Sequence, residues 1–501
     1  MAKLPRLRIK LTLALFCLSI ITAAHAQIFQ TLFTFDGNNG SAPVSLVQGR
    51  DGNFYGVTVH GGGVESCNDV GGCGTVFRIT PQGELTVLHV FCMQTGCPDG
   101  EWPEGGLALG RDGNFYGTTF GGGGLSCEPY GAGCGTFFRI TPTGKFTTLY
   151  RFCTQSLCPD GGLPSGGLVL AADGHFYGTT SQLGPYNAGA IFRITAAGQI
   201  TVLYDFCSKA NCADGAVPWS GLIQATDGSF YGVTGAGGTG SRDGCPDSDL
   251  GCGTIFRLGP FGKVELIYSF CSQPHCTDGA DPTVRLTEGI DGSLFGTTQF
   301  GGDLTCNSPY GCGTIFSFAA NGELTTLQTS ESSSGIYPGP PGGLAQGTDG
   351  NLYGGMGLYG PAGYGTLFEM TPQGALTTLQ TFGDAQGGTG AIIQSTTGVF
   401  YGTTGIWNAP TDGTIFSLDM GLGPFVTFVI PAGQIGQTGG ILGQGFTGTT
   451  SVMLNGVPAN FTVVSDTFIL ATVPAGATTG DVTVTTPGGV LTSNVPFRVI
   501  Q

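Results

Sequence analysis

The chain has 501 residues, of which 93 are glycine and only 10% are charged. Its net charge is −16 at pH 7, which argues against nucleic acid or an anionic membrane surface as a partner. This glycine content would suit a disordered chain, but the glycines recur at fixed positions between short apolar runs and therefore indicate turns between strands.

Residues 1–26 have the composition of an export signal. Four basic residues precede an apolar centre at 11–23, and the small-x-small motif Ala24-His25-Ala26 ends the segment. We expect cleavage before Gln27, which leaves 13 basic against 33 acidic residues and a net charge of −20. The mature protein is then secreted, periplasmic or associated with the cell surface. It has no membrane span, and no anchor is expected at its C-terminus.

From residue 27 to residue 421 one unit of four short strands recurs. In the copy at 166–206 the apolar runs are 168–170, 176–180, 190–194 and 200–206, with turn residues between them. The signature Asp-Gly-x-(aromatic or Leu)-(Tyr or Phe)-Gly precedes each second strand, and Gly-Thr-(apolar)-Phe marks the third. Each signature occurs seven times when the weaker copies at Thr397 and Gly189 are included. A single four-stranded unit cannot bury both faces, so the copies must stack.

The fourth strand is out of step with the other three. It follows only six of the seven third strands, and the matching seventh run, 30–35, precedes the first unit. This offset indicates a closed ring in which Thr31–Phe35 pairs with Thr414–Leu418. We therefore predict an all-β fold in which residues 27–421 form a seven-bladed β-propeller of four-stranded blades, closed by the N-terminal strand. An open solenoid or an incomplete ring is the alternative.

A different pattern begins after a short joint. Residues 424–501 contain seven short candidate strands, with the strong hairpin turn Asn455-Gly456 between two of them. Strands of this number and length predict a small immunoglobulin-like β-sandwich.

Sixteen cysteines remain after residue 26, and they lie in close pairs. Blades lose them two at a time, so we predict eight disulfides between nearest neighbours in an exported protein. The predicted pairs are Cys67–Cys73, Cys92–Cys97, Cys127–Cys134, Cys153–Cys158, Cys207–Cys212, Cys245–Cys252, Cys271–Cys276 and Cys306–Cys312. Zinc binding is the alternative, but the spacings are long for it and no histidines accompany the pairs.

The two faces of the predicted disc differ. Tight turns occupy one face, whereas the second-to-third-strand loops and the blade connections, with every cysteine pair, occupy the other. Binding sites favour loops on a rigid frame, so we expect any site on the long-loop face. Aromatic residues there could stack on sugar rings, or they could pack over the disulfide loops. The candidates are Trp102, Trp219, Trp407, Tyr130, Tyr186 and Tyr310.

A second recurring feature is the unit Asp-Gly-x-x-Pro, which follows four of the cysteine pairs. Its aspartates could hold calcium, which prefers oxygen ligands, or they could shape turns by bonding their own backbone. They are Asp99, Asp160, Asp214 and Asp278. Apart from calcium we expect no cofactor and no metal. The sequence contains no HExxH, GxSxG or phosphate-loop motif, so we predict no catalytic residues.

Two blocks carry a resemblance to known families. The DGNFYG block at 51–56 and the GTVFRITPQGELTVL block at 74–88 resemble the GloVer tandem-repeat proteins, a bacterial secreted and surface family also described as choice-of-anchor. The segments 443–446, 452–459, 473–476 and 482–489 are similar to IPT/TIG domains, which are immunoglobulin-like spacers or interaction modules. Neither resemblance brings a catalytic motif with it.

These observations favour a secreted or surface-associated protein without enzymatic activity. The propeller would present its long-loop face to an extracellular polysaccharide or a surface protein, and the C-terminal domain would act as spacer or docking module. Two alternatives remain open. One is an extracellular enzyme acting on carbohydrates or lactones with the help of calcium, and the other is a structural envelope protein.

Overall fold

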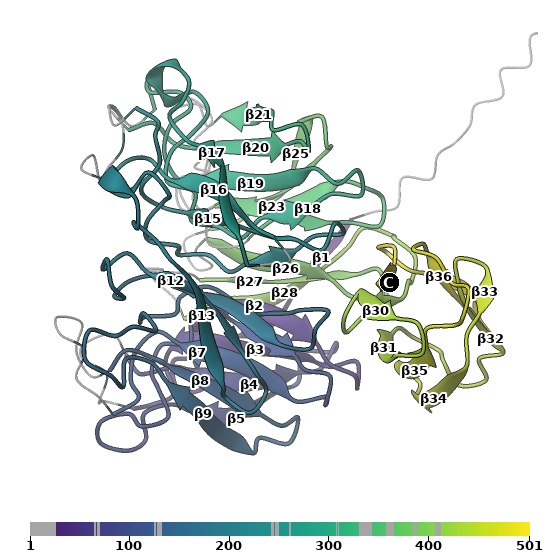
Figure 1. The fold of residues 1–501 in the computed structure, drawn as a ribbon. Helices are drawn as coiled ribbons and strands as arrows, with labels where there is room; N and C mark the ends of the chain where they lie inside the picture. The colour runs from purple at the N-terminus through teal and green to yellow at the C-terminus, as the bar shows by residue number, and fades with distance from the viewer. Residues whose placement is uncertain are drawn as a thin grey trace, which may run out of the picture.

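The computed structural model describes residues 27–500 except 65–66, 68–70, 125–126, 128–132, 242–244, 246–249, 260–261, 307, 309, 330–342, 357–364, 384–387 and 406–411. The fold is all-β (Figure 1). In the described part of the chain the helical elements are two single turns of 3-10 helix, η1 (Ala210–Cys212) and η2 (Pro274–Cys276). The expected export segment lies outside the described residues.

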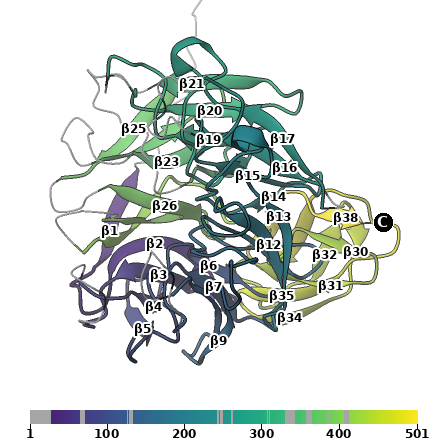
Figure 2. The ribbon, with the colours of Figure 1, turned by 60° about the vertical axis from the view of Figure 1, so that its left-hand side comes forward.

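The described part of residues 28–419 contains seven consecutive four-stranded antiparallel sheets, arranged as in a β-propeller. The first three consist of β2 (Ser41–Gln48), β3 (Phe54–His60), β4 (Thr75–Ile79) and β5 (Leu85–Val90); β6 (Leu107–Leu109), β7 (Phe115–Thr119), β8 (Thr136–Ile140) and β9 (Phe146–Arg151); and β10 (Val169–Leu170), β11 (Phe176–Thr180), β12 (Ala190–Ile194) and β13 (Ile200–Asp205). The next three consist of β14 (Ile223–Gln224), β15 (Phe230–Thr234), β16 (Thr254–Leu258) and β17 (Val264–Ser269); β18 (Thr287–Glu288), β19 (Leu294–Thr298), β20 (Thr314–Phe318) and β21 (Leu324–Thr329); and β22 (Ala345–Gln346), β23 (Leu352–Met356), β24 (Thr366–Met370) and β25 (Leu376–Thr381). Figure 2 shows these sheets arranged around the middle of the molecule.

The seventh sheet joins the two ends of this region. It consists of β26 (Thr389–Gln394), β27 (Phe400–Thr404), β28 (Thr414–Asp419) and β1 (Ile28–Thr34). Thr31 lies opposite Phe416 and Thr34 lies opposite Thr414. The predicted pairing of the N-terminal strand with the last third strand is confirmed.

The glycine of the second-strand signature and the phenylalanine of the third-strand signature recur together because they are in contact. The glycine of the second strand faces the phenylalanine ring of the third, and a Cβ on Gly178 would lie 2.6 Å from Cζ of Phe192. The same holds in the other sheets, for example between Gly117 and Phe138. Only glycine leaves room for the ring, so the ring can fill the space above the second strand.

That same phenylalanine also holds neighbouring sheets together. Phe192 meets Phe152, which follows the fourth strand of the preceding sheet, edge-to-face at 5.3 Å between ring centroids. Equivalent pairs join five further junctions: Phe35–Phe77, Phe91–Phe138, Phe206–Phe256, Phe270–Phe316 and Phe382–Phe416. Phe35 follows β1, so the N-terminal strand makes the interaction of an ordinary fourth strand.

Polar side chains at the short-turn ends of the first strands form hydrogen bonds to the neighbouring sheet. At five junctions a carboxamide or carboxylate accepts a backbone N–H from the turn of the preceding sheet: Gln48 from Thr396, Gln224 from Ala172, Glu288 from Thr226, Gln346 from Ile290 and Gln394 from Thr348. The other two junctions have leucine at this position. There an arginine of the preceding sheet reaches forward instead, Arg50 to the carbonyl of Arg111 and Arg111 to the carbonyl of Ala172. Every junction is therefore bonded.

Residues 425–500, here called the C-terminal region, form a separate group of strands. One sheet contains β29 (Thr427–Phe428), β31 (Thr438–Leu442), β35 (Phe468–Thr472) and β34 (Phe461–Ser465), and a second contains β33 (Val457–Pro458), β32 (Ser451–Leu454), β36 (Val482–Thr486) and β37 (Gly489–Thr492). The strand β30 (Ala432–Gln434) pairs in parallel with β38 (Arg498–Ile500). Val426, Phe446, Ile469 and Val484 are among the buried side chains of the shared core.

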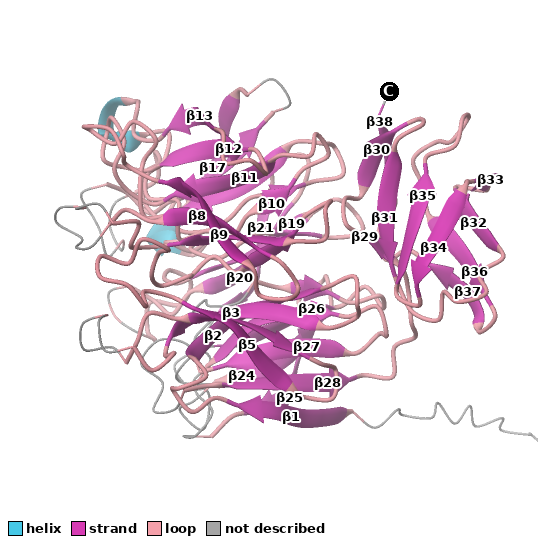
Figure 3. Ribbon diagram, turned by 90° about the horizontal axis from the view of Figure 1, so that it is seen from below, coloured by secondary structure: helices cyan, strands magenta, loops and turns pink. Residues whose placement is uncertain are grey.

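The C-terminal region lies against the short turns of the propeller, opposite η1 and η2 (Figures 1 and 3). The Thr467 hydroxyl donates to the backbone carbonyl of Arg50 at 2.6 Å, and the Arg50 guanidinium lies 4.4 Å from the centre of the Phe468 ring. Gln444 donates to the hydroxyl of Thr396 at 3.0 Å. The region thus contacts the short turns of the first and last sheets.

Candidate functional site

A cavity of about 1340 Å³ runs through the middle of the propeller. Its walls are the first strands of the seven sheets, β2, β6, β10, β14, β18, β22 and β26, together with the residues that precede them. At the short-turn end it is lined by residues of the C-terminal region, namely Thr427, Phe428, Val429, Pro431, Leu442 and Asn494. We call this cavity the central channel.

The chain reaches each first strand through a fixed geometry. The residue before a recurring proline has a left-handed backbone, with φ of 56° at Trp102 and 57° at Val217. The N–H of Trp102 donates to the carbonyl of Cys73 in the preceding sheet, and that of Val217 donates to Ala188. Non-glycine residues adopt this conformation only where surrounding contacts impose it. The arrangement fixes the direction of the chain, and the residue after the proline then lines the channel.

Adjacent first strands touch through their backbones. A Cβ on Gly166 would lie 2.6 Å from the backbone nitrogen of Gly221, and one on Gly105 would lie 2.6 Å from the carbonyl oxygen of Gly166. Glycine is therefore favoured at Gly105 and Gly166, whereas buried Ser220 and Val284 stand at the equivalent place of two later repeats.

The residues that differ between repeats gather on this wall. The position after the recurring proline is Glu104, Ser165, Trp219 or Thr283, and all four line the channel. Two residues further on, Arg285 replaces the glycine found in the equivalent place of the neighbouring repeats. It also lines the channel. Glu104 and Arg285 were missed from the sequence. Aligning the repeats on the proline and looking for departures would have revealed both.

Burial controls the charge state of these groups. It raises the pKa of the Glu104 carboxyl to about 8, so this group holds its proton at neutral pH and can donate a hydrogen bond. It lowers the pKa of the Arg285 guanidinium, although that side chain remains open to the space of the channel. Neither group forms a hydrogen bond or an ion pair with any residue that the structure describes.

Other polar groups on the wall differ in whether they have a partner. Both oxygens of Glu288 accept bonds from Thr226, and burial raises the pKa of Glu288. The hydroxyls of Ser220 and Thr283, in contrast, are buried without a hydrogen-bond partner in the described part of the chain. Unpartnered buried hydroxyls are costly unless a ligand or water completes them.

Trp219 is the predicted aromatic residue that lies on the channel wall. Its carbonyl accepts the Ser165 hydroxyl at 3.1 Å, and its ring lies nearly parallel to that of Phe120 at 6.5 Å. The ring is only partly buried. A planar apolar surface of this kind suits stacking on a sugar or another flat ligand.

The other predicted aromatic residues are placed differently. Trp102 packs against the cluster that contains Cys67, Cys73, Cys92 and Cys97. Tyr186 and Tyr310 are 52% and 37% exposed on the long-loop face. Trp407 and Tyr130 lie outside the described residues. Of the four that are described, Trp219 alone lines the channel.

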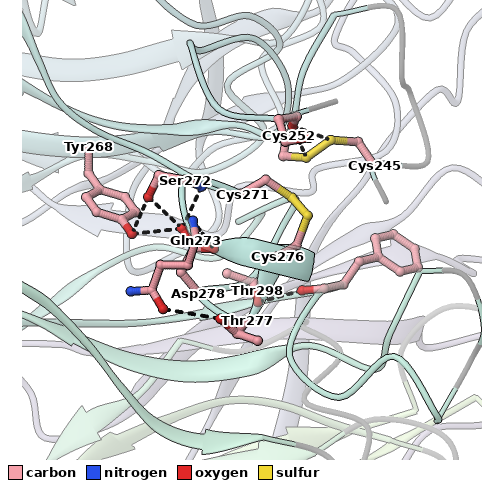
Figure 4. Close-up of a disulfide and its surroundings, with 12 residues drawn as sticks. Cys245, Cys252, Tyr268, Cys271, Ser272, Gln273, Cys276, Thr277, Asp278 and Thr298 are labelled. Carbon is pink, nitrogen blue, oxygen red and sulfur yellow. Dashed lines mark hydrogen bonds between the residues drawn. A yellow bond between two sulfur atoms is a disulfide. The ribbon is translucent and has the colours of Figure 1, made fainter. Parts of the chain in front are cut away.

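The four predicted aspartates lie in the disulfide loops. Asp278 accepts the Tyr268 hydroxyl at 2.8 Å and the backbone N–H of Ser272 at 3.0 Å (Figure 4). Asp160 and Asp214 accept equivalent tyrosine bonds, and Asp99 accepts one from His89. Each carboxylate is occupied by its own loop, and the groups of potential metal ligands found among the described residues do not include these aspartates.

Eight disulfides join neighbouring cysteines on the long-loop side. They are Cys67–Cys73, Cys92–Cys97, Cys127–Cys134, Cys153–Cys158, Cys207–Cys212, Cys245–Cys252, Cys271–Cys276 and Cys306–Cys312. The bridge from Cys245 to Cys252 lies beside that from Cys271 to Cys276 (Figure 4). Disulfides in this number are typical of an oxidising extracellular environment. None of the described residues belongs to a helix long and apolar enough to cross a membrane.

Solved structures with a similar course of the chain are distant. A virginiamycin B lyase from Staphylococcus aureus is 15% identical with a TM-score of 0.47, covering 78% of this chain and 99% of its own. A puromycin hydrolase is 13% identical with a TM-score of 0.47, covering 74% of this chain and 50% of its own. A gluconolactonase from Xanthomonas campestris is 14% identical with a TM-score of 0.38, covering 64% and 86%. Similarity at this level carries no information about function.

Curated proteins provide no significant match to the sequence. The Gloeobacter/Verrucomicrobia repeat, in contrast, matches residues 19–245, 131–338 and 247–457. These matches span all seven sheets of the propeller and extend into the C-terminal region. The chain therefore belongs to the Gloeobacter/Verrucomicrobia repeat family.

Proposed function

We propose that this is an exported binding protein that takes a ligand of the carbohydrate class into its central channel. The seven sheets act as the blades of a closed propeller. The C-terminal region acts as an immunoglobulin-like domain of the IPT/TIG kind that covers one end of the channel, and ligand enters from the long-loop end. The outer surface of the C-terminal region remains available for docking, or the region serves as a spacer.

One observation carries this proposal: the residues that break the repeat converge on the channel wall. A residue repeated in every blade serves the fold, whereas Glu104, Trp219 and Arg285 each occur once at their position. Together they offer a flat aromatic ring, a protonated carboxyl and a cation. A few convergent polar groups in a large concave site are typical of ligand binding.

Several features support the remaining parts of the proposal. Each of the seven junctions has its polar latch, which suits a ring without an open edge. The eight disulfides and the signal-like segment at 1–26 suit export. The two packed four-stranded sheets of the C-terminal region suit a sandwich.

The test is a glycan array followed by calorimetric titration of the best ligand into residues 27–501. We expect Trp219→Ala to weaken binding by roughly tenfold, which lies within the effect of losing one aromatic ring that stacks on a nucleobase, about 1–3 kcal/mol. The matched control is Tyr186→Ala, which removes an exposed aromatic ring from the long-loop face and should leave binding unchanged. Absence of any glycan ligand, or loss of binding with Tyr186→Ala alone, would reject the channel site.

An enzyme is the second candidate, favoured by the state of Glu104. A carboxyl whose pKa is raised to about 8 could act as a general acid on a bound sugar. Chromatographic analysis of the array ligand after prolonged incubation distinguishes the two functions. Cleavage that Glu104→Gln abolishes would favour the enzyme, whereas an intact ligand would favour binding alone.

A further inference from the structure

Arg285 is the one arginine or lysine among the described residues that line the channel. Its equivalents in three other repeats are Gly106, Gly167 and Gly221, so the propeller is built without a side chain at this position. The Arg285 side chain is exposed to the space of the channel, so its charge is available to a ligand there.

The charge of Arg285 has no partner among the described residues. No ion pair or hydrogen bond joins its guanidinium to another described side chain. The described acids on the wall are Glu104, Asp281 and Glu288, and none of them forms an ion pair with Arg285. Glu288 is bonded to Thr226, and Glu104 holds its proton at neutral pH because burial raises its pKa. The guanidinium thus faces the channel as a planar set of donors, the geometry that binds carboxylate and other oxyanions through two parallel bonds.

We infer that the channel selects an anionic sugar, with Arg285 binding its carboxylate or sulfate group and Trp219 stacking on its ring. This inference rests on the proposed function and names the class of ligand for that same site. The acidic chain as a whole repels anions at long range, so the attraction must come from direct contact inside the channel. Salt dependence is therefore a poor test, and variants that change this one charge are a better one.

The experiment compares three trisaccharides by calorimetry: a trigalacturonate, a sulfated galactotriose and neutral galactotriose. We expect the wild type to bind at least one anionic sugar roughly tenfold to a hundredfold more tightly than the neutral one, the value of a hydrogen-bonded charge. Arg285→Gly restores the residue of the sibling repeats, so it should fold normally and lose this preference. Arg285→Lys keeps the positive charge but lacks the planar guanidinium, so it should retain part of the preference for anionic sugars.

The outcomes separate the two proposals. Preference for the carboxylated or for the sulfated sugar identifies the anion and supports the inference. Equal binding of anionic and neutral sugars by the wild type overturns the inference but leaves carbohydrate binding intact, as does an unchanged preference in Arg285→Gly. Failure of all three sugars to bind, with no other glycan retained on the array, overturns both. Circular dichroism and thermal unfolding of each variant verify that the fold is preserved.

Discussion

Removal of the N-terminal strand should open the propeller at a defined place. The perturbation is a protein that starts at residue 37 instead of residue 27, which lacks β1 and Phe35. Phe35 is 3% exposed, and Phe29, Leu32 and Phe33 are partly buried. Full burial of a phenylalanine contributes about 1.5–3 kcal/mol, so these four side chains together contribute about 4–7 kcal/mol. That is a large part of the net stability of a typical domain.

Thermal unfolding followed by calorimetry measures the loss. The unfolding entropy of a chain of this length is roughly 1 kcal/mol per degree, so Tm should fall by about 4–7 °C. The shortened protein should also aggregate more readily, because β28 becomes an exposed edge strand. A synthetic peptide of residues 27–36 should raise Tm again as its concentration increases, since it binds only the folded state. A scrambled peptide is the control. An unchanged Tm after the truncation, or no response to the peptide, would refute closure by this strand.

Two further predictions concern individual side chains. Glu104→Gln should stabilise the protein increasingly as pH rises from about 4.5 to about 8, because in this window the folded wild type keeps a proton that the unfolded chain has released. The gain in unfolding free energy has an upper limit of about 5 kcal/mol, which water in the channel reduces. Urea unfolding measures this gain, and a gain that does not vary with pH would contradict the prediction. Gln224→Ala removes the bond between this glutamine and the preceding sheet and should lower the unfolding free energy by about 1–3 kcal/mol. The control is Gln199→Ala, which changes an exposed glutamine without such a bond and should leave the unfolding free energy unchanged. Equal effects of the two variants would argue against a stabilising bond at this junction.

The propeller was predictable because its constraints are local and repeated. Gly178 and Phe192 belong to one four-stranded unit, and their clash-free contact requires the same two residue types in every copy. The closing strand was recognisable for the same reason, since Phe35 follows β1 as Phe152 follows β9. The position of the run at 30–35, ahead of the first unit, was also informative, because this strand has a partner only if the sheets close into a ring.

The channel was less accessible to sequence reasoning. Trp219 attracted attention as a rare residue, but Glu104 and Arg285 lie at positions where the repeats were compared for what they share. The junction latches were hidden because the partner of each glutamine is the backbone of another sheet. The coverage of the channel by the C-terminal region depends on contacts such as that between Arg50 and Thr467, 417 residues apart. The sequence around Arg50 and the sequence around Thr467 contain no pattern that predicts this contact.

The position of the C-terminal region has a consequence for exchange of strands between molecules. Gln444 contacts the turn of the last sheet, which contains β1, and Thr467 contacts the turn of the first sheet, so this region holds the two sheets at the junction that β1 closes. The short connection 35–40 tethers β1 to β2, which gives it a millimolar effective concentration at its own gap. A strand from a second molecule would have to exceed that concentration to displace it. Domain swapping through β1 is therefore disfavoured in dilute solution, even though no covalent bond holds this strand in the sheet that it completes.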